Sequence, residues 1–272
     1  MSRVYTGYGE SGKGKSTFAT SGNGLCWYAE FDAGSFERTG RDEDDPKYEV
    51  HRYYSPLTSL LNEGVLSTEM AGREGKGAVI VKHHLEGWRE VYWTFIKDYV
   101  EAVKRPDVSY IVLDTSTKLF TMAQNALRQR IQDEVASADQ ADRLKRLEYQ
   151  EPQSQLGQMI EGAKIAGKDL VLVAHETAER WVENKPVGHK ARGWDGAEEE
   201  ADAVLRFTLL DNRPVAEITK AGKGGLDLIG LNIKEPDIET VNDVLDAAAK
   251  LRKAGKAVPR DAMEIIVEGA KL

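Results

Sequence analysis

The sequence from Gly9 to Ser16 reads GESGKGKS, and it constrains the fold more than any other stretch of the chain. It satisfies the pattern G-x-x-x-x-G-K-[ST], known as Walker A, at every fixed position. A short apolar run precedes it, and a run compatible with a helix follows. The stretch therefore predicts a strand, a glycine-rich loop and a helix in that order, as in loops that surround phosphate groups.

The residue types of this stretch suit polyphosphate. Successive backbone N–H groups must point inward, and side chains at Gly9, Gly12 and Gly14 would obstruct them. We expect Lys15 to reach the β- and γ-phosphates, Ser16 to bind Mg²⁺, and the following helix to add its dipole. The expected nucleotide-binding residues are Gly9, Glu10, Ser11, Gly12, Lys13, Gly14, Lys15, Ser16 and Thr17. The alternative is a glycine-rich surface turn without a ligand.

A second motif supplies a carboxylate for the metal. The run SYIVLDTSTKLF, from Ser109 to Phe120, is an apolar strand pattern that ends at Asp114. A carboxylate at the tip of a central strand is expected to hold Mg²⁺ together with Ser16. Alternatively, Asp114 caps the next helix, because DTST is favourable capping chemistry. Elsewhere, His83 and His84 are adjacent and would point to opposite faces of a strand, so we expect no metal site there.

The residue that activates water is left open by the sequence. The run LCWYAEFDAGS is the strand expected after the glycine loop and its helix, and it ends with Glu30 and Asp32. Either carboxylate at that tip could orient and deprotonate an attacking water. Alternation along a strand puts both on the same face, so periodicity does not choose between them. The alternative is that both are solvated acids at a strand end.

The alternation of short β-rich runs with longer helical runs predicts an α/β fold, with a mostly parallel central sheet flanked by helices and a late antiparallel hairpin. Strands are expected at 3–6, 25–31, 49–53, 109–113, 169–174, 203–210 and 215–220. Helices are expected at 15–20, 88–104, 119–149, 154–166 and 238–254. We expect one domain over 1–235, a C-terminal helical tail over 236–272, and a loop or insertion over 64–77.

Composition limits the classes of partner and compartment. The chain has 272 residues and a formal net charge of −8, so any contact with nucleic acid must come from a local patch. The single cysteine, Cys26, excludes a disulfide framework and fits a reducing compartment. No apolar run approaches the roughly 20 residues needed to cross a bilayer, and no signal-peptide core follows Met1. We expect a cytoplasmic protein without membrane contact.

A cationic stretch, RWVENKPVGHKAR, runs from Arg180 to Arg192. Its cations can follow a phosphate backbone and its tryptophan can stack on bases, which suits single-stranded DNA. The candidate DNA-binding residues are Arg180, Trp181, Lys185, Lys190 and Arg192. Against this, the acidic run DGAEEEAD follows directly and would repel a nearby backbone. The alternative is a mobile surface loop whose tryptophans pack on the core.

Together, the glycine loop, the acid-tipped second strand, YIVLDTSTKL, DLVLVAHET and the late EITKAGKGG resemble the RecA-type ATPase core. More closely, they resemble the compact RecA-like ATPases of phages and prophages, including those proposed to act as single-strand annealing recombinases. The resemblance covers roughly residues 3–235. In that family the second strand typically ends Asp-x-Glu-Gly-Gly, which falls on Glu30 to Gly34. Asp32 then takes the place of the usual glutamate, and its shorter reach predicts slow hydrolysis.

The resemblance also implies roles for residues outside these motifs. His175, after LVLVA, matches the polar sensor that reports the γ-phosphate to the ligand-binding loops. Lys220 and Lys223 fall where the family places cations that reach into the neighbouring subunit's nucleotide. The stretch from Arg180 to Arg192 falls where the family has a DNA-binding loop. Alternatively, His175 is a hydrogen-bonded strand-end residue and both lysines are solvated.

The resemblance implies a slow, Mg²⁺-dependent ATPase that acts on single-stranded DNA in recombination or annealing. It implies a homo-oligomer, either a ring or a filament, in the cytoplasm of a bacterial host if the protein is phage-encoded. The alternative function is a nucleotide-gated assembly or regulatory ATPase without DNA binding. Phosphotransfer to a small molecule is a third option.

Overall fold

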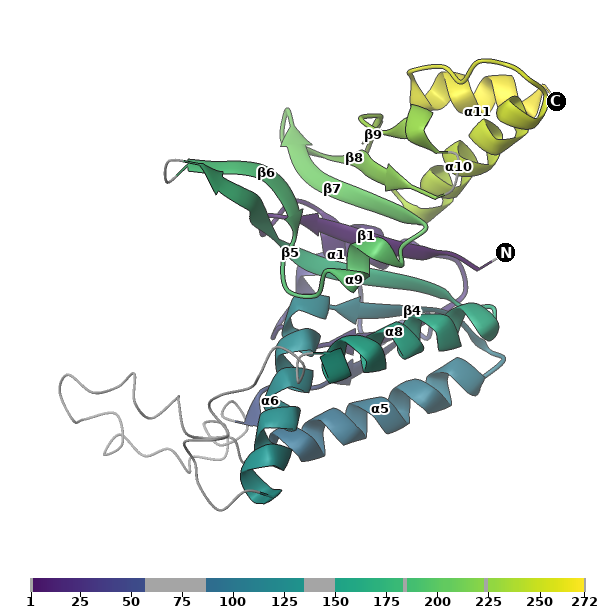
Figure 1. Cartoon of the computed structure of the whole chain (residues 1–272). Helices are drawn as coiled ribbons and strands as arrows, with labels where there is room; N and C mark the ends of the chain where they lie inside the picture. The colour runs from purple at the N-terminus through teal and green to yellow at the C-terminus, as the bar shows by residue number, and fades with distance from the viewer. Residues whose placement is uncertain (1, 57–86, 135–149, 183–184, 223–224, 272) are drawn as a thin grey trace.

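The computed structural model describes residues 2–56, 87–134, 150–182, 185–222 and 225–271 of the chain (Figure 1). Outside these ranges lie the expected loop at 64–77, the pair His83 and His84, the second half of the helix expected at 119–149, and Lys223. Within them, no helix combines the length and the apolar composition that crossing a membrane requires.

The centre of the molecule is one sheet with the strand order β3-β2-β4-β5-β1-β7-β8-β9, and β6 pairs with β5 outside this path. Neighbours from β3 to β7 run parallel, whereas β8, β9 and β6 pair antiparallel with their neighbours. The strands are β1 (Val4–Gly9), β2 (Leu25–Glu30), β3 (Tyr48–Arg52), β4 (Val108–Asp114), β5 (Asp169–Val182), β6 (Lys185–Ala191), β7 (Ala203–Leu210), β8 (Arg213–Ala221) and β9 (Asn232–Lys234).

Helices cover both faces of this sheet, which is why its central strands read as almost continuous apolar runs. Successive residues point to opposite faces, so Trp27 packs with Phe95 of α5 on one face and Tyr28 packs in the cluster that contains Phe18 of α1 on the other. The first face carries α5 (Trp88–Lys104), α6 (Ser116–Glu134) and α8 (Gln150–Ile165). The second carries α1 (Lys15–Ala19) and α10 (Ile238–Lys253), with α11 (Ala262–Ala270) against α10. Short helices are η1 (Glu37–Thr39), α9 (Gly196–Glu199) and η2 (Leu226–Leu228).

The predicted architecture is confirmed: a mostly parallel central sheet, flanking helices and a late antiparallel hairpin, here β7–β8. The stretch from Arg180 to Arg192 was expected as a loop, and this is wrong. β5 continues to Val182 and pairs antiparallel with β6, so that most of the stretch is a β-hairpin (Figure 1). The extension projects beyond the helix-covered sheet and is polar, so it lacks the apolar signal that identified the core strands.

The C-terminal segment begins with a well-formed helix cap, because the Asp237 side chain accepts a hydrogen bond of 2.6 Å from the backbone N–H of Thr240. The buried face of α10, which includes Val241 and Val244, belongs to the same hydrophobic cluster as the central strands. The side chain of Arg3, at the start of β1, contacts Asn242 on α10. The helical segment expected after residue 236 is therefore present, and its status as a separate domain stays a prediction.

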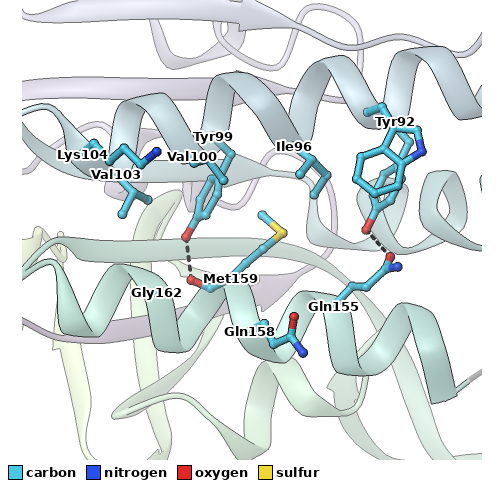
Figure 2. A pocket seen from close by; sticks show the side chains of 11 residues that line it. Tyr92, Ile96, Tyr99, Val100, Val103, Lys104, Gln155, Gln158, Met159 and Gly162 are labelled. Atoms are coloured by element: carbon cyan, nitrogen blue, oxygen red, sulfur yellow. Dashed lines mark hydrogen bonds between the residues drawn. The ribbon is translucent and has the colours of Figure 1, made fainter.

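An apolar groove of about 460 Å³ lies between α5 and α8 (Figure 2). Tyrosines bridge the two helices: the Tyr99 hydroxyl donates to the Met159 carbonyl, and the Tyr92 hydroxyl donates to Gln155 Oε1, both at 2.7 Å. The groove is lined by residues of these two helices alone. Trp93, on the rim of the groove, is half exposed. The groove shares no lining residue with the cavities at the glycine loop that are described below.

Candidate nucleotide site

The glycine loop leaves the carboxyl end of β1, between β5 and β7. A Cβ atom on Gly9 would lie 2.5 Å from the Phe207 carbonyl oxygen, and one on Gly14 would lie 2.9 Å from the Pro214 side chain. Gly12 has free space around it, but its φ of +74° is a conformation that favours glycine. Glycine is thus required at two positions by the approach of the β7–β8 hairpin and at the third by backbone conformation.

Helix α1 follows the loop directly and spans only Lys15–Ala19. Because so short a helix sums few peptide dipoles, its electrostatic contribution to anion binding is small. Lys15 compensates for this weak helix dipole, because it is a buried cation at the start of the helix. Its Nζ donates to the carbonyls of Gly9 at 2.9 Å and Glu10 at 2.6 Å. Burial lowers the pKa of Lys15, and the nearby Asp114 carboxylate opposes that effect.

Asp114 ends β4 and is almost fully buried, with 1% of its surface exposed. Ser16 Oγ donates to Asp114 Oδ2 at 2.6 Å, and the Tyr28 hydroxyl donates to the same oxygen. Burial raises the pKa of Asp114, whereas these two hydrogen bonds act in the opposite direction. The first turn of α6 is capped by Thr115, whose Oγ1 accepts from the Lys118 N–H at 3.2 Å. The Asp114 side chain therefore faces the glycine loop and does not act as the helix cap.

The donor atoms of Ser16 and Asp114 suit Mg²⁺. A hydroxyl and a carboxylate are hard oxygen ligands, and Mg²⁺ is usually held by one or two carboxylates together with substrate phosphates and water. Across the described ranges there is no group of three or more His, Cys, Asp or Glu side chains that could hold a metal ion. The pair thus fits a metal that arrives with a nucleotide better than a metal held by the protein alone.

Glu30 and Asp32 occupy different environments, although the sequence could not separate them. Glu30 is fully buried, and its Oε1 accepts from the Ser35 N–H at 3.0 Å. Its Oε2 forms an ion pair with Arg52 Nε at 3.4 Å, without hydrogen-bond geometry. Asp32 instead lines the cavity at the glycine loop and pairs with Arg38 at 3.3 Å. Of the two carboxylates, only Asp32 lines this cavity.

Two adjoining cavities surround the loop. The smaller, of about 70 Å³, is lined by the loop itself, Asp32, Arg38 and Asp114, among others. The larger, of about 840 Å³, is bounded by the start of α6, His175 and Glu176 in the middle of β5, and the segment after β6. Ser11 and His175 line both. The two cavities therefore meet at a wall that contains part of the loop and the imidazole.

His175 connects this site to the strands around it. Its backbone N–H donates to Thr117 Oγ1 at 3.1 Å, and its carbonyl accepts from the Arg192 N–H at 2.7 Å. The pKa of His175 is lowered mainly by burial, while the carboxylate of Asp32 opposes the shift. Its position between the cavities is compatible with the predicted sensor role, which stays a prediction.

Two residues at the site were missed by sequence reasoning. Arg38, on η1, donates to the Ala33 carbonyl at 3.0 Å and lines the smaller cavity beside Asp32. Tyr28 bonds Asp114 from the neighbouring strand. Arg38 follows Asp32 by six residues, so a search for cations near the acid-tipped strand would have found it. Nothing local distinguishes Tyr28 from a core aromatic, because its importance lies in the partner of its hydroxyl.

Four of the five predicted DNA-binding residues lie on the β5–β6 hairpin, and Arg192 follows it directly. The structure puts the backbones of Arg180, Trp181 and Lys185 in the β5–β6 hairpin. Lys190 Nζ is paired with Asp195 Oδ1 at 2.8 Å, and Arg192 lines the larger cavity. Trp194, two residues after Arg192, is 5% exposed and belongs to the hydrophobic core. Of the candidates with a described side chain, Arg192 alone lines a cavity at the glycine loop.

Lys220 lies away from its own glycine loop. Strand register aligns Lys220 with Val204 and Val204 with Thr6, so Lys220 is near the middle of β1 and not its carboxyl end. Its Nζ donates to the carbonyls of Glu198 at 2.5 Å and Glu199 at 2.6 Å, at the end of α9. Reaching a neighbouring subunit would require these bonds to break, and the predicted role in another subunit's site stays a prediction.

The fold and the site together define the class. A glycine loop that follows a parallel strand, a buried lysine at the next helix and a carboxylate at the end of β4 are the parts of a P-loop α/β protein.

Comparisons with known proteins add little to this assignment. No protein-family model matches the sequence, and no curated protein matches it. Among solved structures, the crystal structure of the RadB recombinase is similar over 85% of this chain and 86% of that chain, at 12% sequence identity and a TM-score of 0.42.

Proposed function

We propose that this chain is a RecA-like ATPase that binds ATP with Mg²⁺ at the glycine loop. One observation carries the proposal: Ser16 donates at 2.6 Å to a fully buried carboxylate, Asp114, that reaches the loop from a strand not adjacent to β1. Keeping a carboxylate buried is costly unless it is hydrogen-bonded or bound to a metal. The alternative of a ligand-free surface turn gives no reason for that arrangement.

The residues around the loop have separate roles in this proposal. The loop amides and Lys15 bind the phosphates, since Lys15 is a buried cation whose present partners are carbonyls of the loop itself. Ser16 and Asp114 hold Mg²⁺, which when bound offsets the negative charge that develops on the phosphates. Asp32, on the cavity wall, orients and deprotonates the attacking water, and Arg38 holds its carboxylate in place. The short side chain of Asp32 limits its reach, so hydrolysis is slow.

We further propose that the protein acts on single-stranded DNA during recombination or annealing, as a homo-oligomer. The support is positional, because Arg192 lies on the larger cavity next to the loop and its N–H is bonded to the carbonyl of His175. A nucleotide that moves His175 would therefore also move the end of the β5–β6 hairpin. A phage origin stays a prediction from the resemblance, and a cytoplasmic location stays a prediction from composition.

The second candidate is a nucleotide-gated regulatory ATPase without DNA contact. One observation favours it: Lys190 is already paired with Asp195, the first residue of the acidic run that follows the hairpin. A paired cation contributes less to phosphate binding, and the run repels a polynucleotide.

One experiment tests both nucleotide binding and DNA binding. The wild-type chain is titrated with a non-hydrolysable ATP analogue and then with a labelled single-stranded oligonucleotide. We expect Mg²⁺-dependent analogue binding, and DNA affinity that rises with nucleotide and falls steeply with salt. Absence of DNA binding at low salt, with and without nucleotide, would leave the regulatory function. Absence of any analogue binding at saturating Mg²⁺ would remove the ATPase proposal itself.

A further inference from the structure

A chain of buried hydroxyls leads from the proposed metal ligand into the core. The Tyr28 hydroxyl donates to Asp114 Oδ2 and lies 3.2 Å from Ser35 Oγ. Tyr28 is fully buried, and Ser35 and Asp114 are each 1% exposed. Bulk water therefore does not readily replace the hydrogen-bond partners of these three side chains. The geometry of Asp114 is therefore set from within the protein as well as by Ser16.

The direction of these hydrogen bonds follows from counting protons. An ionised carboxylate only accepts, so Tyr28 must donate its single proton to Asp114. Its oxygen is then available as an acceptor, and Ser35 is the donor in the Tyr28–Ser35 pair. The hydroxyls of Ser35 and Tyr28 thus point in sequence toward Asp114. Such an ordered chain strengthens each bond in it.

Glu30 fixes the far end of this chain. Its Oε1 accepts from the backbone N–H of Ser35 at 3.0 Å, which holds the turn that also carries Asp32. Its Oε2 is paired with Arg52, whose guanidinium binds Glu43 through two hydrogen bonds of 2.7 and 2.6 Å. Both the hydroxyl chain and the turn are therefore anchored on a carboxylate that does not line the nucleotide cavity.

We propose that Tyr28 and Ser35 form a hydroxyl relay that positions the Asp114 carboxylate for Mg²⁺, with Glu30 as its anchor and not as a catalytic base. This inference rests on the proposed function, because it assumes that Asp114 binds the metal. Tyr28 is a positioning residue: it bonds the proposed metal ligand and does not line the cavity at the glycine loop. Its ring packs edge-on against Phe36 at 5.1 Å between centroids, so phenylalanine can keep the packing and remove only the hydroxyl.

The test compares Tyr28→Phe with a matched control, Tyr110→Phe. Tyr110 lies on the neighbouring strand β4, is 2% exposed, and its hydroxyl interacts with the thiol of Cys26. The readout is the affinity of the full-length, ADP-bound protein for Mn²⁺, measured by electron paramagnetic resonance. We expect Tyr28→Phe to weaken Mn²⁺ binding about 10- to 100-fold, as loss of an outer partner of a ligand does. ADP affinity in EDTA should stay the same, and Tyr110→Phe should match wild type.

Unchanged Mn²⁺ affinity in Tyr28→Phe, with wild type binding normally, would overturn the relay and leave the proposed function intact. If wild type bound no metal and no nucleotide, the proposed function would fail instead. A second readout does not depend on ligands: urea unfolding in EDTA of Tyr28→Phe, Ser35→Ala and the double variant. We expect clear non-additivity, because the two side chains share one hydrogen bond. Strict additivity would overturn the relay.

Discussion

The glycine-loop site and the β5–β6 hairpin both carry cations that the sequence singled out, but Lys15 in the loop site is buried whereas Lys190 in the hairpin is not. Lys15 is 7% exposed and bonded to two loop carbonyls, whereas Lys190 is on the surface and paired with Asp195. A buried, bonded group is already in place when a ligand arrives, so it gives up little entropy on binding. A surface cation is screened by salt and contributes in proportion to its number. The two regions are therefore expected to respond very differently to single substitutions.

The largest effect should come from Lys15→Ala. It removes charge-assisted hydrogen bonds to the phosphates, each worth about 1.5–3 kcal/mol, so nucleotide affinity should fall about 100-fold or more. Calorimetry with an ATP analogue measures the loss. Lys104→Ala, on the rim of the α5–α8 groove, is the control and should bind like wild type. Wild-type affinity in Lys15→Ala would contradict the assignment of the loop.

The next effect separates the two carboxylates of the second strand. Asp32→Asn should reduce ATP hydrolysis about 10²- to 10⁴-fold and retain ATP affinity, because it removes the group that accepts the proton from water. Glu30→Gln should act mainly on folding, with the free energy of unfolding lower by about 1–3 kcal/mol, since it neutralises a buried carboxylate that accepts a hydrogen bond from Ser35 and pairs with Arg52. Turnover and urea unfolding are measured on both variants. A reversal of the two phenotypes would make Glu30 the base.

A smaller effect is expected in the hairpin. Arg192→Ala should weaken single-stranded DNA binding several-fold and reduce the slope of log affinity against log salt by about one. Lys190→Ala should change less, because that cation is paired with Asp195. Fluorescence anisotropy across a salt series measures both. Equal, negligible effects of the two variants would mean that DNA does not pass this end of the hairpin.

The smallest effect concerns pH. Burial lowers the pKa of His175 below its ordinary value of about 6.5, so the unfolded chain takes up this proton at a higher pH than the folded one. Stability is therefore lost as the pH falls from about 6.5 through the lower folded pKa. In that window, His175→Gln should make the free energy of unfolding rise less steeply with pH. The change in slope should correspond to less than one bound proton. An unaltered slope would mean that the imidazole titrates as it does in water.

The sequence predicted those parts of the fold and site that depend on local order. Gly9 to Ser16 and the apolar run ending at Asp114 are contiguous patterns, and the fold brings Ser16 and Asp114 within hydrogen-bond distance. The outer part of the β5–β6 hairpin lacks apolar alternation, and strand β9 has only three residues, too few to show a pattern. Neither could be predicted from the sequence. Both are set by pairing with a neighbouring strand.

The contrast between Glu30 and Asp32 shows a limit of periodicity. The two residues share a face only if the strand continues, and β2 ends at Glu30. The turn that follows carries Asp32 to the glycine loop and leaves Glu30 in the core. Tyr28 and Arg38 were missed for a related reason, because their roles depend on partners that the chain brings together only after folding.

The approach of Phe207 and Pro214 to the glycine loop has a consequence for biosynthesis. The loop is synthesised well before β7 and β8, the strands that pack behind it. A nascent polypeptide would expose an open, unbraced loop until β7 and β8 had left the ribosome. Tight capture of a nucleotide should then coincide with completion of the sheet and not with emergence of the motif itself.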